Sequence, residues 1–471
     1  MLGGTVSAPI SDKGKKYLNI MKKAVLTLFV SILLTPLHSQ PLSLEECMAY
    51  AVEHSTTVGQ RANSLASARE DYISAVASAL PSLSAGSGGS VNFGRSVDPE
   101  TNTYTTVSTF SNSYSVSAGL TLFSGFSTIN GIRAAKVARA MGVENLQLAR
   151  DEAAMNAMAA YFDVVYYTGA ATIAADALAA SELNLKKAAK NFELGLASAA
   201  DVAEIEAQVA ANDVSLTEQQ NNLSLAEIRL REVMNYPQDE PLEIDTDVRI
   251  ESELVGASFD EVLDNALANN PRMRSAELNS RYSEISYSIA KGRYYPSISA
   301  GGGYSTSFYT NLDNASAYDS WWRQIKQNRG SYVSVSMSIP IFSGLGRRTS
   351  KHRARYNMSN AMLQEEAVRR SVESEVAQAY SQMLGYGKQY VQGRKKVKAT
   401  ELAYNGVSQK FAKGMVSAIE LQTAANNLQQ ARSEMLRSRL QYIIKCRMVD
   451  YYNGIPLLER RPSHAPASAI F

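Results

Sequence analysis

The chain has 471 residues, and its 47 basic and 45 acidic side chains leave a formal net charge of only +2. A balance this close to neutral gives no support to nucleic-acid binding. Four histidines and two cysteines, with no metal-ligand spacing and no nucleophile motif, argue against an enzyme and against a bound metal or cofactor.

Two cysteines in so long a chain do not form a disulfide framework. The second half of the chain has Val262 where the first half has Cys47, so an apolar residue can stand at that position. We therefore expect Cys47 and Cys446 to be small buried hydrophobic residues rather than partners in a bridge.

The N-terminal part has the pattern of a secretory signal peptide. A basic start at residues 21–23 precedes a short apolar run at residues 24–34, and Ser39 is a small residue at the expected cleavage point. We expect translation to begin at Met21 and residues 1–39 to be removed. The apolar run is too short to cross a membrane as a helix, and no other stretch approaches ~20 apolar residues.

The rest of the chain is internally duplicated. Residues 43–46 match 258–261 and residues 80–86 match 295–301, both 215 positions apart, and residues 120–125 match 339–344 at a spacing of 219. The difference in spacing falls in a loop, where insertions are tolerated. We divide the chain into a first repeat, a linker, a second repeat and a flexible C-terminal tail, at residues 40–236, 237–257, 258–454 and 455–471.

Each repeat contains two segments in which apolar residues alternate with serine or glycine. This period of two over about ten residues is the signature of a transmembrane β-strand with one face in lipid and one toward a wet lumen. A soluble sheet with one solvated face is the alternative. The predicted strands lie near residues 82–93, 113–123, 297–308 and 332–342. Four strands cannot close a barrel, and open edges are costly in lipid, so we expect an oligomer that shares one barrel.

Polar segments and tight turns flank these strands. Residues 94–112 and 309–330 are rich in Asn, Asp, Ser and Thr, as expected for loops at the outer face of a membrane. Candidates for an interfacial aromatic girdle are Tyr304, Phe308, Trp321 and Trp322. The strand-to-helix turns are formed by Phe123, Ser124 and Gly125 in the first repeat and by Phe342, Ser343 and Gly344 in the second.

A very long helix follows each turn, because no proline interrupts residues 101–236 or 341–455. From about Phe126 and Gly344, these helices are roughly 65–70 residues long, or about 100 Å at ~1.5 Å per residue. After each of them, apolar residues recur every seven positions, which is the pattern of a coiled-coil seam. These positions are Val202, Val209, Leu216, Leu223 and Leu230, and Leu421, Leu428, Met435, Tyr442 and Val449.

The long helices end in two matching hairpins. A glycine in each can adopt the left-handed conformation that closes a helix, a serine can cap the next helix, and an acid three residues later completes a capping box. The glycines are Gly195 and Gly414, the serines Ser198 and Ser417, and the acids Asp201 and Glu420. Loops this short place the joined helices antiparallel and side by side.

These features together resemble the TolC-like outer-membrane factors, the exit ducts of Gram-negative efflux pumps and type I secretion systems. The resemblance covers residues 43–453 and rests on the duplicated element order, the Leu-Phe-Ser-Gly and Ile-Phe-Ser-Gly junctions, and the Gly-Leu-x-Ser-x-x-Asp and Gly-Met-x-Ser-x-x-Glu hairpins. It implies an α+β membrane protein in which long antiparallel coiled-coil helices form an α-helical barrel and four strands per protomer contribute to a shared transmembrane β-barrel. It also implies a homotrimer in the outer membrane of a Gram-negative bacterium, with a large periplasmic portion.

The function implied by the resemblance is a passive exit duct in a tripartite efflux pump. The duct would stand in outer-membrane lipid and open when a periplasmic adaptor, or membrane fusion protein, and an inner-membrane pump dock. The adaptor would dock on the hairpin tips, formed by Gly195, Leu196, Ser198, Gly414, Met415 and Ser417. Helix capping alone is the other explanation of these residues.

Acidic residues near the tips are candidates for a constriction. Threefold symmetry would turn Asp201, Glu204 and Glu420 into rings of carboxylates that attract cations. The alternative is that acids in the first turn of a helix only stabilise its dipole.

The second tip departs from well-known members of the family that the chain resembles. Val416 stands where those members carry a basic residue that ties the closed aperture by ion pairs, and Thr423 where they carry a second acid. Phe411 lacks the hydroxyl that an aromatic residue can carry there. We therefore expect apolar contacts of Phe411, Met415 and Val416, instead of ion pairs, to contribute to the closed state.

Other functions stay open at this point. The outer-membrane component of a type I protein secretion system would have the same architecture, and a soluble periplasmic coiled-coil scaffold would use the strands as an ordinary sheet. Substrate choice in such systems would reside mainly in the pump and adaptor, so drugs, metal ions and proteins are all open as cargo.

Overall fold

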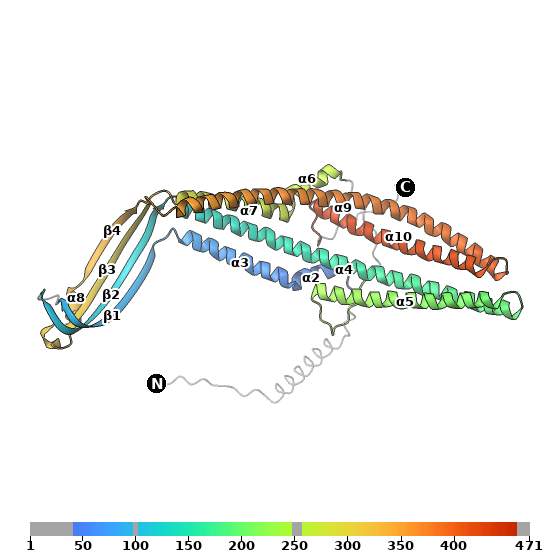
Figure 1. Ribbon diagram of the computed structural model, residues 1–471, viewed down its shortest axis with the longest axis horizontal. Helices are drawn as coiled ribbons and strands as arrows, with labels where there is room; N and C mark the ends of the chain where they lie inside the picture. The colour runs from blue at the N-terminus through green and yellow to red at the C-terminus, as the bar shows by residue number, and fades with distance from the viewer. Residues whose placement is uncertain (1–40, 98–101, 247–256, 459–471) are drawn as a thin grey trace, which may run out of the picture.

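The protein is a long rod of helices with a narrow β-sheet at one end (Figure 1). The computed structural model describes residues 41–97, 102–246 and 257–458. The predicted leader lies outside the described residues, as do part of the predicted linker and most of the predicted tail. Within the described ranges, no helix is both long enough and apolar enough to cross a membrane.

The two repeats build the same series of elements, which confirms the predicted internal duplication. The first repeat consists of α2 (Leu44–His54), α3 (Thr56–Ala77), β1 (Ser82–Val97), β2 (Tyr104–Ser124), α4 (Ser127–Glu193) and α5 (Ala199–Met234). The second consists of α6 (Phe259–Asn269), α7 (Pro271–Gly292), β3 (Ser297–Asn311), β4 (Gly330–Ser338), α9 (Gly346–Ala412) and α10 (Ala418–Tyr452). It has in addition a 3-10 helix, η1 (Ala315–Ala317), and a short helix, α8 (Trp321–Gln327), between its strands.

The longest elements are α4 and α9, with 67 residues each, so the predicted length is confirmed. Each spans about 100 Å at ~1.5 Å per residue. Helices α5 and α10, with 36 and 35 residues, run back along the half of the rod that lies farther from the sheet (Figure 1). The predicted seam is buried most clearly in α10, at Leu421, Leu428, Tyr442 and Val449.

The four strands form one antiparallel sheet in the order β1-β2-β3-β4. The two repeats meet in the middle of this sheet, where Ser115 of β2 pairs with Ser305 of β3. Within the described residues, the outer edges of β1 and β4 have no partner strand.

Several strand boundaries differ from the sequence prediction. Residues 94–112, predicted above as a loop, instead continue β1 to Val97 and begin β2 at Tyr104. The Thr, Val and Tyr residues of this segment favour strands, although their polarity resembles that of a loop. Strand β4 ends at Ser338 rather than near residue 342, because Pro340 has no N–H group to donate to a ladder.

Two apolar clusters fill the middle of the rod, where α2 and α6 pack against the long helices. One buries Cys47 beside Tyr161, and the other buries Cys446 beside Val262, so both cysteines are buried as predicted. Burial raises the pKa of the Cys47 thiol to about 12, and this thiol therefore stays protonated at neutral pH.

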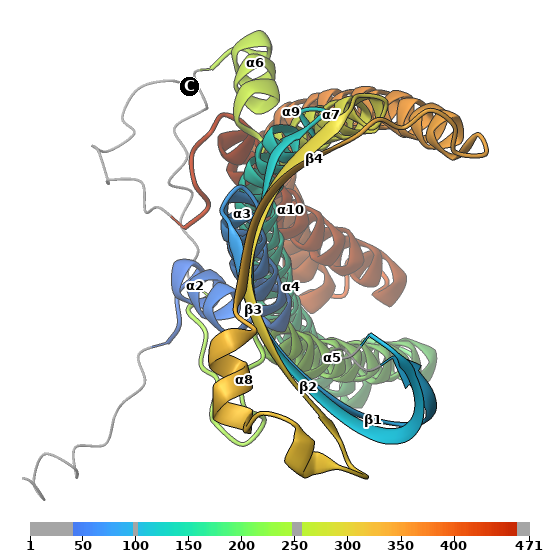
Figure 2. The same ribbon diagram turned by 90° about the vertical axis from the view of Figure 1, so that its left-hand side faces the viewer.

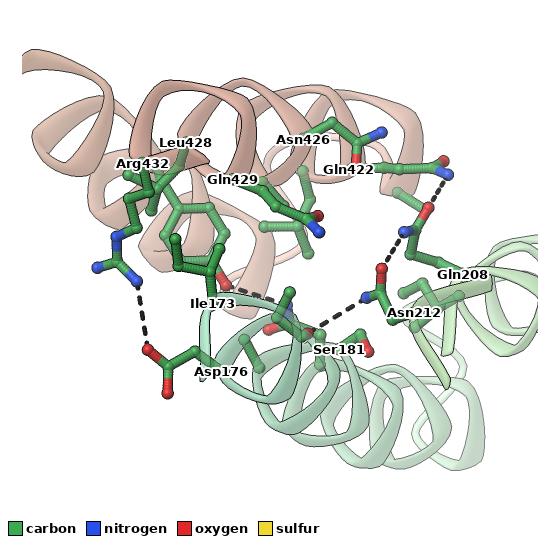
Figure 3. Close-up of a pocket in the computed structure, with 18 of the residues that line it drawn as sticks. Ile173, Asp176, Ser181, Gln208, Asn212, Gln422, Asn426, Leu428, Gln429 and Arg432 are labelled. Atoms are coloured by element: carbon green, nitrogen blue, oxygen red, sulfur yellow. Dashed lines mark hydrogen bonds and ion pairs between the residues drawn. The ribbon is translucent and has the colours of Figure 1, made fainter. Parts of the chain in front are cut away.

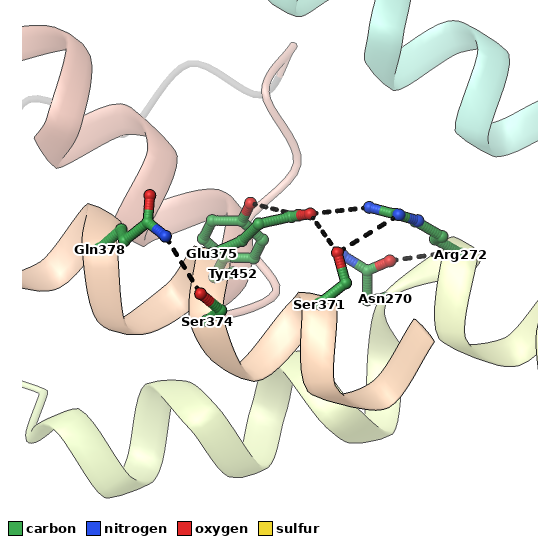
Figure 4. Close-up of polar contacts among 7 residues, drawn as sticks. All are labelled: Asn270, Arg272, Ser371, Ser374, Glu375, Gln378 and Tyr452. Atoms are coloured by element: carbon green, nitrogen blue, oxygen red, sulfur yellow. Dashed lines mark hydrogen bonds and ion pairs between the residues drawn. The ribbon is translucent and has the colours of Figure 1, made fainter. Parts of the chain in front are cut away.

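Polar contacts tie the end of α10 to the surrounding helices. The Arg272 guanidinium of α7 donates to the Glu375 carboxylate of α9 at 2.8 Å, and the Tyr452 hydroxyl of α10 donates to the same carboxylate at 3.4 Å (Figure 4). The neighbouring Tyr451 donates to Asp151 of α4 at 3.0 Å. These contacts join four helices at the middle of the rod, between the sheet and the hairpins.

Candidate pore wall and hairpin tips

The two faces of the sheet differ in polarity. Directly paired residues point to the same face, so the register places Val116 of β2 beside Tyr304 of β3, and Ala300 of β3 beside Val335 of β4. One face is therefore apolar on all four strands. Its large exposed side chains are Leu83, Val91, Phe93, Tyr114, Val116, Tyr304, Val333, Val335 and Met337.

The opposite face consists mostly of serine and glycine. Serine hydroxyls pair across the strands on this face, Ser84 with Ser117 at 2.9 Å and Ser90 with Ser111 at 2.8 Å. Among the described strand residues, this face carries no charged side chain. Apart from the exposed ring of Tyr332, it is a neutral surface, mainly of small hydroxyl groups and glycines.

The curvature of the sheet distinguishes its two faces in space. Figure 2 shows the sheet as an arc with α8 on its convex side. Helix α8 contacts the apolar face, because Trp321 meets the Tyr114 ring edge-on at 6.0 Å and Thr306 donates to the carbonyl of Ile325 at 2.8 Å. The apolar face is therefore convex and the serine face concave. This is the arrangement expected of one sector of a transmembrane barrel wall.

Each strand-to-helix turn contains two successive left-handed residues. The φ angles are +61° and +65° at Gly125 and Phe126, and +56° and +65° at Gly344 and Leu345. In the first turn, the Ser124 hydroxyl accepts a hydrogen bond from the Thr128 N–H at 3.2 Å. Left-handed φ is uncommon for residues other than glycine, so the sequence does not reveal the conformation of the residue after each glycine.

The structure places the other residues of these turns at the sheet margin. Phe123 and Ser124 end β2, whereas Phe342 and Ser343 lie in the segment between β4 and α9. Phe123 packs edge-on against Phe126 with ring centroids 5.2 Å apart, and Phe342 is exposed.

Both hairpin tips close their first helix in the same way. Gly195 and Gly414 have φ angles of +72° and +69°. The N–H of the next residue returns to a carbonyl in the last turn of the helix, at 2.8 Å for Leu196 and 3.0 Å for Met415. This hydrogen bond is the one that defines a Schellman motif, which requires a residue able to adopt left-handed φ.

The helix starts at the two tips differ. Ser198 accepts from the Asp201 N–H at 3.2 Å and donates its own N–H to the Asp201 carboxylate at 3.0 Å, which completes a capping box. The Ser198 hydroxyl also donates to the Asp201 carboxylate, at 2.7 Å, and this bond together with that from the Ser198 N–H lowers the pKa of Asp201. Ser417 accepts from the Glu420 N–H at 3.3 Å, but the described contacts contain no return bond, and the Glu420 side chain is exposed instead. The capping box predicted at the second tip is therefore only half formed.

A small apolar cluster joins the two hairpins close to their tips. Its buried members are Ala188, Ile205, Phe411, Ala418 and Leu421, which come from α4, α5, α9 and α10. Val416 packs against this cluster, whereas Met415 lies outside it and is 68% exposed. The structure thus brings together two of the three residues with predicted apolar contacts, Phe411 and Val416, and separates Met415 from them.

The three candidate acids lie in different surroundings. Asp201 is held in its capping box, Glu204 lines a cavity between the hairpins, and Glu420 is exposed at the start of α10. The Asp201 carboxylate is thus hydrogen-bonded at the start of its own helix, and Glu204 lies among the polar residues that line the cavity.

A polar seam lies behind the apolar cluster, around a cavity of about 150 Å³ (Figure 3). Gln422 of α10 donates to Gln208 of α5, which donates to Asn212 at 2.8 Å, and Asn212 donates to the carbonyl of Ala177 in α4 at 3.2 Å. This chain of amides connects three helices. Because it joins the hairpins by hydrogen bonds rather than by packing, we call it the amide seam.

Arg432 bounds the other side of the same cavity. Its guanidinium lies 3.6 Å from Asp176 of α4 (Figure 3). It also lies 3.0 Å from Glu401 of α9, so one cation of α10 links both long helices. The carboxylates are largely solvent-exposed, so each ion pair contributes little by itself.

The amide seam was not among the sites predicted from the sequence. Asn212 falls on the same heptad row as Ile205 and Ala226, both of which are buried. A buried row that contains an amide indicates a polar partner on a facing helix. The place of Asn212 in this heptad row therefore indicates a polar contact, but the sequence does not show which helix supplies the partner.

Comparison with known proteins agrees with this architecture. The chain matches the family model described as "Outer membrane efflux protein" over residues 50–236 and 262–447, once in each repeat. It is 22% identical over 357 residues to the outer membrane efflux protein BepC of Brucella suis, covering 76% of this chain and 74% of BepC. It is also 22% identical over 343 residues to the outer membrane protein TolC of Escherichia coli, covering 71% of this chain and 68% of TolC.

Solved channel structures have the same fold. The outer membrane protein VceC of Vibrio cholerae superposes with a TM-score of 0.74 at 14% identity, over 87% of this chain and 96% of VceC. The open state of the MtrE outer membrane channel of Neisseria gonorrhoeae superposes with a TM-score of 0.69 at 20% identity, over 88% of each chain.

The family and the fold are those of outer-membrane channel proteins. The chain belongs to the outer membrane efflux protein family. As in its relatives, its location is the outer membrane of a Gram-negative bacterium. The predicted fold class, with long antiparallel helices and four strands in two repeats, is confirmed.

Proposed function

We propose that three copies of this chain form the passive exit duct of a tripartite efflux pump. The observation that carries the proposal is the curved sheet, whose apolar face is convex and whose two edge strands have no partner within the described chain. Unpaired backbone groups are costly in lipid, so the edges of β1 and β4 pair with other copies. Three sheets of four strands make a barrel of twelve strands, within the known range of even-numbered barrels.

The internal repeat supports a specific pairing between copies. Strand β4 corresponds to β2, and β1 corresponds to β3, so the contact of β2 with β3 is a template for β4 with β1 of the next copy. Under this correspondence, Ser115 is equivalent to Ser334 and Ser305 is equivalent to Ser90. The pair Ser115–Ser305 within one chain therefore predicts that Ser334 of one copy pairs with Ser90 of the next.

The hairpin tips serve as the docking surface for a periplasmic adaptor in this proposal. Around Gly195, Ser198, Gly414 and Ser417, the end of the rod exposes large apolar side chains. They are Leu194, Leu196, Met415 and Ile419. Exposed apolar surface of this kind is typical of protein interaction sites, and the apolar tip of a helical hairpin would cover it.

Opening of the duct follows from the way in which the hairpins are joined. A small apolar cluster and the amide seam hold the two hairpins of one chain together near their tips. Separation of the hairpins replaces hydrogen bonds of the seam by bonds to water, which costs less than disrupting a large apolar core. An adaptor that binds the separated arrangement more tightly would open the duct. Rings of Asp201, Glu204 and Glu420 would then attract cations at the aperture.

Photocrosslinking in cells tests the docking surface. A photoreactive residue is placed at Ser198 or at Ser417, with exposed Ser224 on α5 as the control position away from the tips. We expect both tip positions, but not the control, to capture a periplasmic adaptor. The pump that works with that adaptor then distinguishes drug or metal efflux from type I protein secretion. Capture of neighbouring copies alone would contradict adaptor docking at the tips.

A further inference from the structure

Helix α8 replaces a strand at the edge of the sheet. Strand β4 pairs with β3 only as far as Gly330 opposite Ser305, whereas β3 continues to Asn311. Beyond this point, the side chain of Gln324 donates to the carbonyl of Tyr309 at 2.8 Å and accepts from the N–H of the same residue at 2.9 Å. One glutamine thus bonds to the β3 backbone as a neighbouring strand would, and it fixes α8 against the sheet.

In the proposed channel, α8 lies at the level of the outer leaflet of the membrane. The helix lies on the convex, apolar side of the sheet (Figure 2), at the half of the strands that is farther from the helical rod (Figure 1). Asn328, directly after α8, donates to the carbonyl of Ser307 at 2.9 Å, which keeps the helix level with the last part of β3. In the proposed channel, α8 therefore lies between the barrel wall and lipid.

The exposed side of α8 combines an indole ring with cations. Trp322 is 69% exposed, and Arg323, Lys326 and Arg329 are all exposed. Arg323 pairs with Asp319 at 2.8 Å, and its side chain remains 64% accessible. Among the described contacts, neither Lys326 nor Arg329 forms an ion pair with a carboxylate. Three cations facing one acid leave this surface positively charged.

We propose that α8 and Arg329 bind phosphate-bearing anionic lipid headgroups of the outer leaflet. The inference rests on the proposed placement of the sheet in the membrane. A tryptophan at this depth anchors to the interface between headgroups and acyl chains, and each cation near the surface attracts anionic lipid. Guanidinium groups also match the oxygen atoms of a phosphate geometrically. The long side chains of Arg323 and Lys326 reach the headgroups while their stems remain along the apolar wall.

Tryptophan fluorescence tests this proposal directly, because the two tryptophans of the chain, Trp321 and Trp322, both belong to α8. The full chain is reconstituted into phosphatidylcholine vesicles that contain an equal mole fraction of brominated phosphatidylglycerol or brominated phosphatidylcholine. We expect the anionic lipid to quench about threefold more strongly at low salt. Because exposed charges are screened, the preference should fall as the salt concentration rises.

The variant R323Q/K326Q/R329Q should abolish the preference for anionic lipid and leave quenching by brominated phosphatidylcholine unchanged. The matched control R394Q/K395Q/K398Q removes the same charge from exposed positions of α9, far from the sheet, and should keep the preference. Equal quenching of the wild-type protein by both lipids would overturn the proposal.

Conductance in the same vesicles separates this proposal from the proposed function. In one outcome, the protein conducts ions while neither brominated lipid quenches its tryptophans. This result would show that α8 does not contact lipid, and it would overturn the headgroup site alone. A protein that neither conducts nor responds to lipid would overturn the channel as well.

Discussion

The backbone of Gly125 lies directly against that of Gly292, such that a Cβ atom at Gly125 would be only 2.1 Å from the carbonyl oxygen of Gly292. The turn after β2 fits the end of α7 only because both positions lack a side chain. This contact joins the two repeats. Its counterparts by repeat correspondence are Gly344 and Ala77, and a Cβ atom at Gly344 meets nothing within 4 Å in the single chain. Ala77 carries a side chain, so its contact with Gly344 is less close than that of Gly125 with Gly292, but the repeat correspondence still places Gly344 at the end of α3 of the next copy.

Alanine at the two turn glycines should have different effects. Gly125→Ala places a Cβ against backbone at a φ of +61°, and we expect a cost of at least ~2 kcal/mol and little folded protein in the outer-membrane fraction. Gly344→Ala places its Cβ against no other atom of the single chain. Its cost there is about 1–2 kcal/mol, because alanine disfavours the left-handed φ of +56°. It should instead weaken the trimer, measured as thermal dissociation of the detergent-extracted protein on native gels.

Gly195→Ala is the matched control for this comparison, because its φ is +72° and a Cβ atom there also meets nothing within 4 Å. Its trimer should dissociate close to the wild-type temperature. Equal dissociation temperatures for Gly344→Ala and Gly195→Ala would contradict a contact between Gly344 and α3 of the next copy.

The first hairpin tip should be sensitive to acid. Hydrogen bonds from Ser198 lower the pKa of Asp201 below its ordinary value of 3.8. The stabilisation is therefore present above pH 3.8 and is lost as the pH falls through the lower folded-state pKa. The hydrogen-exchange protection factors of the first turn of α5, measured relative to the intrinsic rate at each pH, should fall below pH 3.8 in the wild-type protein. In Asp201→Asn this acid-dependent change should disappear, and its persistence would assign the effect to another group.

Removal of the cap hydroxyls should loosen the tips unequally. Ser198→Ala breaks a complete capping box and should cost ~1 kcal/mol of local stability. Ser417→Ala removes one hydrogen bond of a half-formed box, so we expect a smaller effect. Hydrogen exchange at the start of α5 and of α10 measures both changes. A larger loss of protection in Ser417→Ala would contradict this order of the two caps.

The amide seam should control the closed state of the duct. Gln422→Ala removes the bond from α10 to Gln208 of α5, and a hydrogen bond contributes about 1 kcal/mol, so the open probability in planar bilayers should rise about fivefold. Gln220→Ala changes an exposed amide on α5 and is the matched control. If both variants conduct like the wild-type channel, the seam does not contribute to closure.

Cys47 should be inert until the protein unfolds. Because burial raises the pKa of its thiol from 9.0 to about 12, the thiolate fraction at pH 8 is roughly a thousandfold lower than in the unfolded chain. Alkylation by iodoacetamide should therefore follow the unfolding rate. Stability should fall between pH 9.0 and about 12, where only the unfolded thiol ionises. Cys47→Val, which copies the buried Val262 of the second repeat, should fold normally and lose the thiol's contribution to this pH dependence, whereas buried tyrosines such as Tyr161 and Tyr452, whose pKa values burial raises above 10.0, keep theirs.

Features set by a few neighbouring residues were predictable from the sequence. The hairpins follow from a glycine and a serine three residues apart, and the lengths of α4 and α9 follow from the absence of proline. The strands follow from their period of two, apart from boundaries in segments whose threonines and serines resemble a loop.

Features that depend on distant partners were not predictable. Helix α8 has seven residues, too few to be stable alone, and it exists through its contacts with β3, such as that of Gln324 with Tyr309. The link from Gln422 to Gln208 joins residues more than two hundred positions apart, and no local pattern identifies such a pair. The separation of Met415 from Phe411 depends likewise on how the two hairpins meet.

The most direct measurement of the shared barrel is a disulfide between neighbouring copies. By repeat correspondence, Ser334 of β4 in one copy faces Ser90 of β1 in the next, with Cβ atoms about 4.5–5.5 Å apart. Oxidation of S90C/S334C in intact cells should yield covalent trimers on non-reducing gels. The control V91C/S334C shifts the register by one residue and points one thiol to the other face, so it should not cross-link. Efficient cross-linking of the control, or reactive but unlinked thiols in S90C/S334C, would contradict a barrel closed by β4 and β1.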